Sequence, residues 1–284
     1  MVFLNCFTRN AKFIIDRDRV VVNFKRRFFY KKMIFDTHTH YDDDAFANDL
    51  DEVLQKAREN GVGRITNIAS DLPSIDKCLE LAEKYEQIYC AHGVHPTECG
   101  EMTDEDLSAI REKLAHRKAV AVGEIGLDYY WDTPDRDIQR HWFKKQLQLA
   151  MEVQKPIVVH SREAAEETFR ILEENYDGDG VIHCYSYSAE MAKEYVKRGY
   201  FLGVGGVVTY KNARKLVETV EAVPLTSIVL ETDCPYLSPD PYRGKRNSSA
   251  NLPLVVKKIA ALKDVSEETV IRQTEENAER LYHL

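Results

Sequence analysis

The feature that most limits the fold of this chain is an alternation of short, β-branched apolar runs with longer amphipathic segments. Eight runs have the length of strands and end in polar residues, namely 33–38, 64–70, 88–93, 119–126, 156–160, 180–185, 200–206 and 227–233. Helical patterns separate them, as at residues 50–60, 75–85, 140–154, 189–199 and 212–223. This alternation predicts a single-domain (β/α)8 TIM-type barrel. A doubly wound sheet is the alternative, but no glycine-rich loop follows the first run.

Residues 1–32 differ in charge from the rest of the chain. They hold nine Lys and Arg against two Asp, whereas residues 33–284 hold 30 Lys and Arg against 45 Asp and Glu. A targeting peptide would need a continuous apolar region, which this segment lacks. The stretch "FKRRFFYKK" would suit a nucleic-acid-binding arm, since it mixes bases with aromatics. We favour a third interpretation, in which residues 1–32 are a basic extension, disordered or upstream of the true start at Met33, and residues 33–284 form the domain.

The composition of the chain limits the cellular compartment and the classes of partner that we expect. Six cysteines without a CxxC pair predict reduced thiols and a cytoplasmic protein. No apolar run approaches the ~20 residues that span a bilayer, so we expect no membrane partner. The acidic domain is a poor general binder of polyanions, and it would need bound cations to act on nucleic acid.

Polar side chains gather at the carboxyl ends of the predicted strands. They are Asp36, His38 and His40 on the first, Glu124 on the fourth, His160 on the fifth, His183 on the sixth, and Glu231 and Asp233 on the eighth. Strand ends of a barrel meet at one mouth, and residues i and i+2 of a strand share a face. One such histidine could be a core residue, but four with carboxylates predict a metal site. Imidazole and carboxylate suit Zn²⁺, Mn²⁺ or Mg²⁺, and a set of this size suits two ions.

From Met33 to its end, the chain resembles the TatD family of metal-dependent hydrolases, within the amidohydrolase-like barrel superfamily. The motifs occur in the family's order: "FDTHTHYDDDAF", "GVHP", "VGEIGLDYY", "QLQLAMEVQKPIVVHSREA", "IHCYSYS", "GYFLGVGGVVTYKNA", "LETDCPYLSP" and "YRGKRN". Residues 1–32 have no counterpart. The chain departs from the family at Asn247-Ser248-Ser249, where Glu-Pro commonly follows the Asn, at Glu163 and at Thr97. These departures spare the ligand set and leave the contacts at the rim open.

The resemblance implies a pair of divalent ions, Mg²⁺, Mn²⁺ or Zn²⁺, and assigns their ligands. One ion would be held by His38, His40, Glu124 and Asp233, and Glu124 would bridge to a second ion held also by His160 and His183. A water between two ions loses a proton near neutral pH and becomes a hydroxide nucleophile. Glu124 and Asp233 would therefore be catalytic as well, with Asp233 relaying that proton.

Several further residues have two interpretations each. His95 of "GVHP" could donate to a phosphate or protonate the leaving group, or it could only hold the turn before Pro96. Arg162 could clamp a phosphate or pair with Glu163. Tyr129, in the stretch Asp128–Tyr130, could stack on a base or pack under a helix.

The remaining candidates follow from position alone. Arg246 belongs to the only locally basic stretch after residue 32 and is a candidate substrate contact. Asp36 and Glu231 share faces with ligands, so we expect them to orient imidazoles. Cys184 and Cys234 directly follow ligands and are expected to pack rather than react.

The resemblance implies a deoxyribonuclease with 3′–5′ exonuclease-like action on strand ends. The acidic surface favours strand ends, short oligonucleotides or a tRNA terminus over long duplex. An ester hydrolase on the same metal site, such as a D-aminoacyl-tRNA deacylase, is the alternative. A non-catalytic scaffold is disfavoured by the intact ligand set. No obligate protein partner is evident from the sequence.

Overall fold

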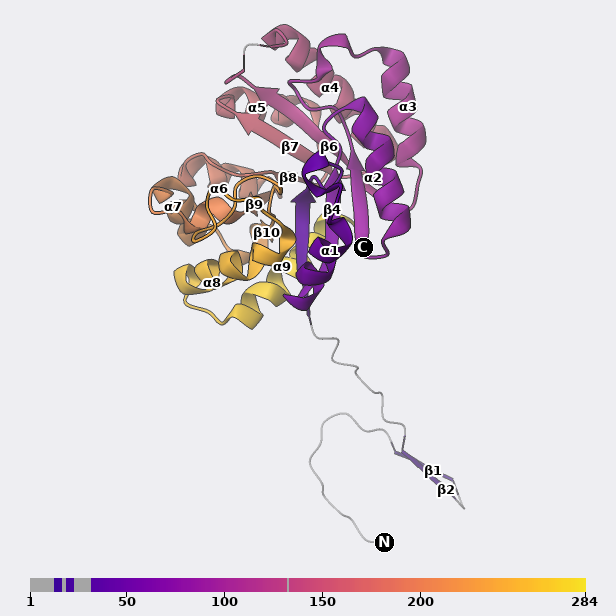
Figure 1. Ribbon diagram of the computed structural model, residues 1–284, viewed down its shortest axis with the longest axis vertical. Helices are drawn as coiled ribbons and strands as arrows, with labels where there is room; N and C mark the ends of the chain where they lie inside the picture. The colour runs from indigo at the N-terminus through magenta and orange to yellow at the C-terminus, as the bar shows by residue number, and fades with distance from the viewer. Residues whose placement is uncertain (1–12, 17–18, 23–31, 132) are drawn as a thin grey trace. The chain divides into compact units, whose positions relative to one another are not determined.

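The computed structural model describes residues 13–16, 19–22, 32–131 and 133–284. The chain divides into two units, Met1–Lys31 and Lys32–Leu284. In the first, β1 (Phe13–Asp16) pairs antiparallel with β2 (Arg19–Val22) (Figure 1). The rest of this unit lies outside the described residues, so the interpretation of residues 1–32 as an extension stays a prediction.

The second unit is built on eight parallel strands that pair in chain order (Figure 1). They are β3 (Ile34–Thr39), β4 (Val62–Ile68), β5 (Ile88–His92), β6 (Ala119–Asp128), β7 (Ile157–Arg162), β8 (Gly180–Ile182), β9 (Phe201–Val204) and β10 (Ile228–Leu230). Beyond β10 the chain meets β3 again, where Asp233 donates its N–H to the carbonyl of His38 at 3.0 Å. His40 donates to the carbonyl of Cys234 at 2.9 Å. The strands therefore form a nearly closed barrel, which confirms the predicted fold.

Helices alternate with the strands and cover the outside of the barrel. They are α1 (Leu50–Glu59), α2 (Leu72–Lys84), α3 (Asp104–Leu114), α4 (Arg136–Val153), α5 (Ala165–Asn175), α6 (Ala189–Lys197), α7 (Arg214–Ala222), α8 (Leu252–Lys263) and α9 (Glu267–Leu281). Their starts follow from local sequence: Asp71 and Ser74 form a capping box at α2, and Ser266 caps α9. Within the described residues, no helix is both long enough and apolar enough to cross a membrane.

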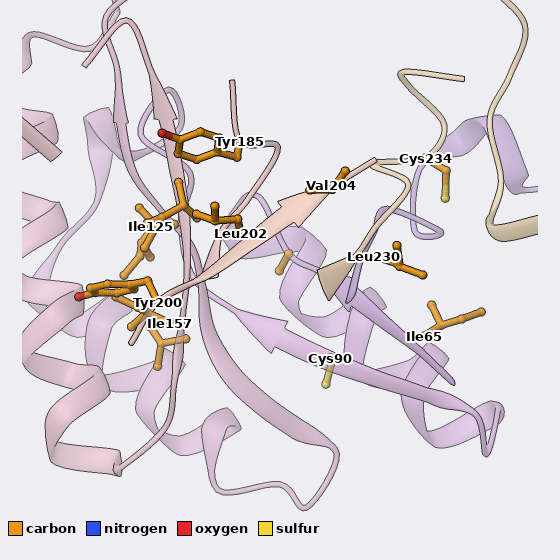
Figure 2. Close-up of a cluster of buried hydrophobic side chains, with 14 of the residues drawn as sticks. Ile65, Cys90, Ile125, Ile157, Tyr185, Tyr200, Leu202, Val204, Leu230 and Cys234 are labelled. Atoms are coloured by element: carbon orange, nitrogen blue, oxygen red, sulfur yellow. The ribbon is translucent and has the colours of Figure 1, made fainter. Parts of the chain in front are cut away.

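The apolar core has an outer and an inner part. The outer part lies between strands and helices, and Figure 2 shows Ile125, Ile157 and Leu202 from three strands within it. The inner part fills the barrel, and α9 contributes Leu281 and Tyr282 to it. The Tyr282 hydroxyl donates to the carbonyl of Thr37 at 2.7 Å, which ties α9 to β3.

Side chains alternate between the two faces of each strand, and this alternation links the inner core to the polar residues at the mouth of the barrel. Val158 and Val181 belong to the inner cluster, and His160 and His183 follow two residues later. Because side chains two apart share a face, an inward apolar residue places a polar one above it at the carboxyl end. The inner core thus positions the candidate site.

Candidate metal centre

Glu124, on β6, lies at the middle of the polar cluster, and its two carboxylate oxygens face different histidines. Its Oε1 is 2.9 Å from Nδ1 of His160 and 3.8 Å from Nε2 of His183. Its Oε2 is 3.4 Å from Nε2 of His38. The side chain is buried, so few waters solvate it and the imidazoles are its main polar neighbours. This arrangement is the one that a carboxylate shared between two ions requires.

Asp233 completes the cluster from the segment after β10. Its Oδ1 lies 3.5 Å from Nε2 of His40, 3.7 Å from Nε2 of His183 and 3.8 Å from Nε2 of His38. The structure therefore brings all six predicted ligands together at one end of the barrel. Their assignment as ligands remains a proposal, because proximity alone does not show an ion.

Three histidines are held by a second contact on the far side of the ring. Nδ1 of His40 is 2.9 Å from the carbonyl oxygen of Ile68, and Nδ1 of His183 is 3.2 Å from Oε2 of Glu231. A carbonyl accepts only from N–H, so Nε2 of His40 is free to face the cluster. Such outer partners fix the tautomer and orientation of metal-binding imidazoles. Glu231 thus contacts an imidazole, which agrees with the orienting role predicted for it.

Asp128, the last residue of β6, is the third such partner, and sequence reasoning missed it. Its Oδ2 lies 2.9 Å from Nε2 of His160, which leaves Nδ1 of that ring toward Glu124. Its pKa stays lowered, because His160 and backbone N–H groups outweigh burial. Asp128 lies beyond the predicted strand at 119–126, whereas β6 extends to Asp128 itself. Its spacing of four from Glu124 was the available signal, since even spacing puts both on one face of a strand.

Asp36, which we expected to orient an imidazole, lies elsewhere in the structure. The carboxylate is fully buried, yet it contacts no imidazole. Its Oδ2 accepts from the hydroxyls of Ser249 at 2.6 Å and Thr232 at 2.8 Å, and its Oδ1 accepts from the Thr232 N–H at 3.0 Å. The prediction that Asp36 orients an imidazole is therefore wrong. It ties β3 to the segment that carries Asp233.

The charges of the cluster test whether its residues fit a divalent ion. Burial raises the pKa of Glu124, but His183 and His38 hold it well below its usual range, so the carboxylate is ionised. Burial lowers the pKa of His183, but Glu231, Glu124 and Asp233 raise it to about 10. Without an ion, buried carboxylates are thus balanced by imidazolium. Nε2 of His38 and Nε2 of His40 also lie only 3.2 Å apart, with room for one proton between them. A cation among these nitrogen and oxygen donors would satisfy both features, so the set fits.

His95 reaches the same centre from the loop after β5. Its Nε2 is 3.9 Å from Oε1 of Glu124, and its ring packs edge-on against His160. Its Nδ1 lies 2.7 Å from the Thr97 hydroxyl oxygen and 3.2 Å from the Thr97 backbone N–H. Because a backbone N–H can only donate, its contact favours the tautomer with the proton on Nε2. Burial and the charge of His160 lower the pKa of His95 to about 3, so the ring is neutral. His95 both holds the turn and points an N–H toward the cluster.

A cavity of about 640 Å³ opens over these residues. Its lining includes Glu124, His160 and Asp233 from the cluster, together with His95. One side of it, which we name the acidic rim, consists of Asp42, Asp43, Asp44, Asp71 and Glu98. Lys77 is the one Lys or Arg among the residues that line this cavity. The cavity therefore offers little positive charge to a phosphate backbone.

The three predicted substrate contacts lie outside the lining of this cavity. Tyr129 lies under Arg136 and donates its hydroxyl to Glu167 at 2.5 Å, so it is a packing residue. Arg246 forms a bidentate pair with Asp49 at 2.9 and 2.5 Å. The structure does not bring either one to the centre.

Arg162, Cys184 and Cys234 make contacts that bear on their predicted roles. The guanidinium of Arg162 lies 3.8 Å from the ring centroid of Tyr130, rather than beside Glu163. Cys184 contacts Glu231 through its N–H, and Cys234 is fully buried. Burial raises the pKa of both thiols, which disfavours thiolate. Within the described part of the chain the cysteines form no disulfide, as predicted.

Comparison with known proteins places this geometry in a family. The family described as TatD related DNase matches residues 35–283. The uncharacterized metal-dependent hydrolase YabD of Bacillus subtilis is 44% identical over 254 residues, which cover 89% of this chain and 100% of YabD. YcfH of Escherichia coli, likewise an uncharacterized metal-dependent hydrolase, is 35% identical over 88% of this chain and 96% of its own length. The crystal structure of YjjV, a TatD homologue from Escherichia coli, superposes with a TM-score of 0.84 and 32% identity, and covers 88% of this chain and 98% of YjjV. The chain therefore belongs to the TatD family of metal-dependent hydrolases.

Proposed function

We propose that this chain is a deoxyribonuclease that hydrolyses phosphodiester bonds with two divalent ions, acting in a 3′–5′ direction on strand ends and short oligonucleotides. The observation that supports it most is the buried Glu124 carboxylate, with one oxygen toward His38 and the other toward His160 and His183. That geometry suits two ions sharing one ligand. The family's description as TatD related DNase supports the choice of DNA.

The ligands of the first ion would be His38, His40, Glu124 and Asp233, and those of the second Glu124, His160 and His183. When bound, such ions supply Lewis-acid polarisation of the phosphoryl group and lower the pKa of water at the site. Asp233 is the carboxylate best placed to take a proton, because its side chain is 18% exposed while that of Glu124 is 5% exposed. Glu124 stays ionised and holds its charge fixed.

His95 would bind the substrate rather than act as an acid. Its tautomer presents Nε2–H toward the centre, and a neutral imidazole gives up that proton poorly. The same N–H is a good hydrogen-bond donor to a phosphoryl oxygen, where negative charge grows during reaction. Of the two roles predicted for His95, the geometry favours donation to the phosphate.

The acidic rim supports small or terminal substrates. A groove that follows a duplex needs several cations along the backbone, and this cavity is lined by acids on one side. A strand end can reach the centre with one or two phosphates inside the cavity. We therefore expect single strands and frayed ends to be cleaved faster than closed duplex.

The test is an assay of protein reconstituted with Mg²⁺, Mn²⁺ or Zn²⁺ on labelled single-stranded DNA, duplex DNA, RNA and aminoacyl-tRNA. Glu124→Gln and Asp233→Asn remove charge with little change in shape, and we expect each to lower DNA cleavage at least about a hundredfold. Glu190→Gln, an exposed carboxylate in the first turn of α6, is the matched control.

The outcomes separate the mechanism from the substrate. Undiminished cleavage by Glu124→Gln and Asp233→Asn would refute the proposed centre. Hydrolysis of aminoacyl-tRNA with no cleavage of DNA, abolished by the same two substitutions, would keep the centre and replace deoxyribonuclease by ester hydrolase. Cleavage from 5′ ends or within closed circles would refute the proposed polarity.

A further inference from the structure

Two large aromatic side chains are exposed at the carboxyl end of β6, beside the mouth of the barrel. Tyr130 is 50% exposed and Trp131 is 56% exposed. Their rings meet edge to face, with centroids 4.9 Å apart. Aromatic side chains usually bury most of their surface, so an exposed pair next to a catalytic mouth indicates a binding surface. Neighbouring Tyr129 is packed away, so the exposure is particular to this pair.

Arg162, the last residue of β7, adds a cation to the pair. Asp128 and Arg162 are register partners, so the ends of β6 and β7 are adjacent (Figure 1). The guanidinium lies 3.8 Å from the ring centroid of Tyr130, which is close enough for a cation–π contact. Among the described residues, Arg162 forms no ion pair, and its N–H donors remain available to a phosphate.

Asp128 couples this surface to the metal centre. One carboxylate oxygen, Oδ1, accepts the backbone N–H groups of Tyr130 at 3.0 Å and Trp131 at 3.2 Å. The other, Oδ2, lies 2.9 Å from Nε2 of His160. The same carboxylate therefore contacts both the backbone of the aromatic pair and the candidate ligand His160.

Charge distinguishes this side of the mouth from the other. The acidic rim lies on the segments that follow β3, β4 and β5, and it repels phosphate. The aromatic pair lies at β6 and β7, with Arg162 beside it and Arg136 over Tyr129. Of these two sides, the β6–β7 side is therefore the more favourable for a nucleic-acid strand that enters the cavity.

We propose that Tyr130, Trp131 and Arg162 form a nucleotide subsite, in which a base of the DNA strand stacks on Trp131 and its phosphate pairs with Arg162. The inference rests on the proposed function and adds to it the side from which the strand enters. Any base can stack on an aromatic ring, so the subsite would bind strands of any base sequence. It would favour single strands, because their bases are free to stack.

The test compares intact and abasic oligonucleotides. Short single strands carrying one abasic residue at each position in turn are assayed with metal-loaded wild type, Trp131→Ala and Trp131→Phe. We expect one position at which the abasic residue raises the KM of the wild type about tenfold, the effect of one lost base stack. Trp131→Ala should remove that discrimination, and Trp131→Phe should restore part of it. Arg162→Ala should raise KM for intact and abasic strands alike.

Two matched controls lie elsewhere on the surface. Tyr242, 44% exposed in the segment between β10 and α8, is an exposed aromatic outside the lining of the cavity. Arg117 is an exposed arginine just before β6, at the other end of the barrel from Arg162. Tyr242→Ala and Arg117→Ala should behave as wild type. Equal discrimination in Trp131→Ala and Tyr242→Ala would overturn the subsite.

A binding titration separates the subsite from the proposed activity. The chain has two tryptophans, and Trp142 is buried, so quenching of Trp131 fluorescence reports stacking directly. Phosphorothioate oligonucleotides, which resist cleavage, should quench it, and the strand abasic at the sensitive position should not. Quenching without cleavage of any DNA would refute the deoxyribonuclease and keep the subsite. Binding without quenching would refute the subsite alone.

Discussion

Replacing Asp128 by Asn tests whether the centre depends on the tautomer of one histidine. In Asp128 the oxygen Oδ1 accepts two backbone N–H groups, from Tyr130 and Trp131, and Oδ2 faces Nε2 of His160 at 2.9 Å. The amide oxygen of Asn will keep the two backbone contacts. Its NH₂ group will then face Nε2, which is a donor in the wild type. Two donors cannot bond, so His160 must move its proton from Nε2 to Nδ1.

The size of the effect follows from where Nδ1 lies. It is 2.9 Å from Oε1 of Glu124 and faces the centre, so a proton there removes the lone pair that an ion would use. Loss of such an outer partner typically lowers metal affinity 10- to 100-fold. This corresponds to about 1.4–2.7 kcal/mol. The change should affect the ion shared with His183 and spare the one held by His38 and His40.

Calorimetric titration of chelator-treated protein with Mn²⁺ measures both affinities. We expect Asp128→Asn to weaken one of two binding events about 10- to 100-fold. Asp137→Asn removes an exposed carboxylate from the first turn of α4 and should leave both unchanged. Equal Mn²⁺ affinities in Asp128→Asn and wild type would refute the tautomer argument. A uniform loss at both ions would show a general disturbance instead.

Four further predictions follow from the same contacts. Chelation should lower the melting temperature by about 5–10 °C for each bound ion at ion concentrations near 100 Kd, and less in His38→Ala, as seen by differential scanning fluorimetry. Ser249→Ala leaves the buried Asp36 carboxylate one donor short and should cost about 1–3 kcal/mol in urea unfolding. Tyr129→Phe should leave KM for DNA unchanged, and a raised KM would return Tyr129 to the substrate site. In metal-free protein the pKa of His183 is about 10 against 6.5 unfolded, so its stabilisation is complete below pH 6.5 and is lost as pH rises toward 10, measurable by unfolding at several pH values.

The barrel could be predicted from sequence because its signal is repeated. Several strands show an inward apolar residue two places before a polar one, as at Val158 and His160, Val181 and His183, and Val229 and Glu231. A parallel barrel then forces the polar ends together without any knowledge of side-chain packing. The helices that wrap the strands follow from periodicity in the same way.

Residues beyond the strand ends could not be placed by that reasoning. After Asp128 the alternation stops, so nothing in the sequence distinguishes packed Tyr129 from exposed Tyr130. The partner of Arg246 is Asp49, almost two hundred residues away, and only the fold brings them together. Asp36 looked equivalent to the histidines by spacing, but a register shift in β3 between Asp36 and Thr39 breaks the shared face.

The distribution of charge sets an order for assembling the active site. Without ions, the mouth presents ionised Glu124 and Asp233 behind an acidic rim, and phosphate is repelled from it. The same rim raises the local concentration of divalent cations, which the buried imidazoles bind only after losing protons. The two proposed ions, when bound, would then add four positive charges where substrate oxygens must lie. The acidity that makes residues 33–284 a poor polyanion binder is therefore compatible with a nuclease, because the proposed DNA contacts are confined to the metal-loaded centre and to the neighbouring Tyr130, Trp131 and Arg162.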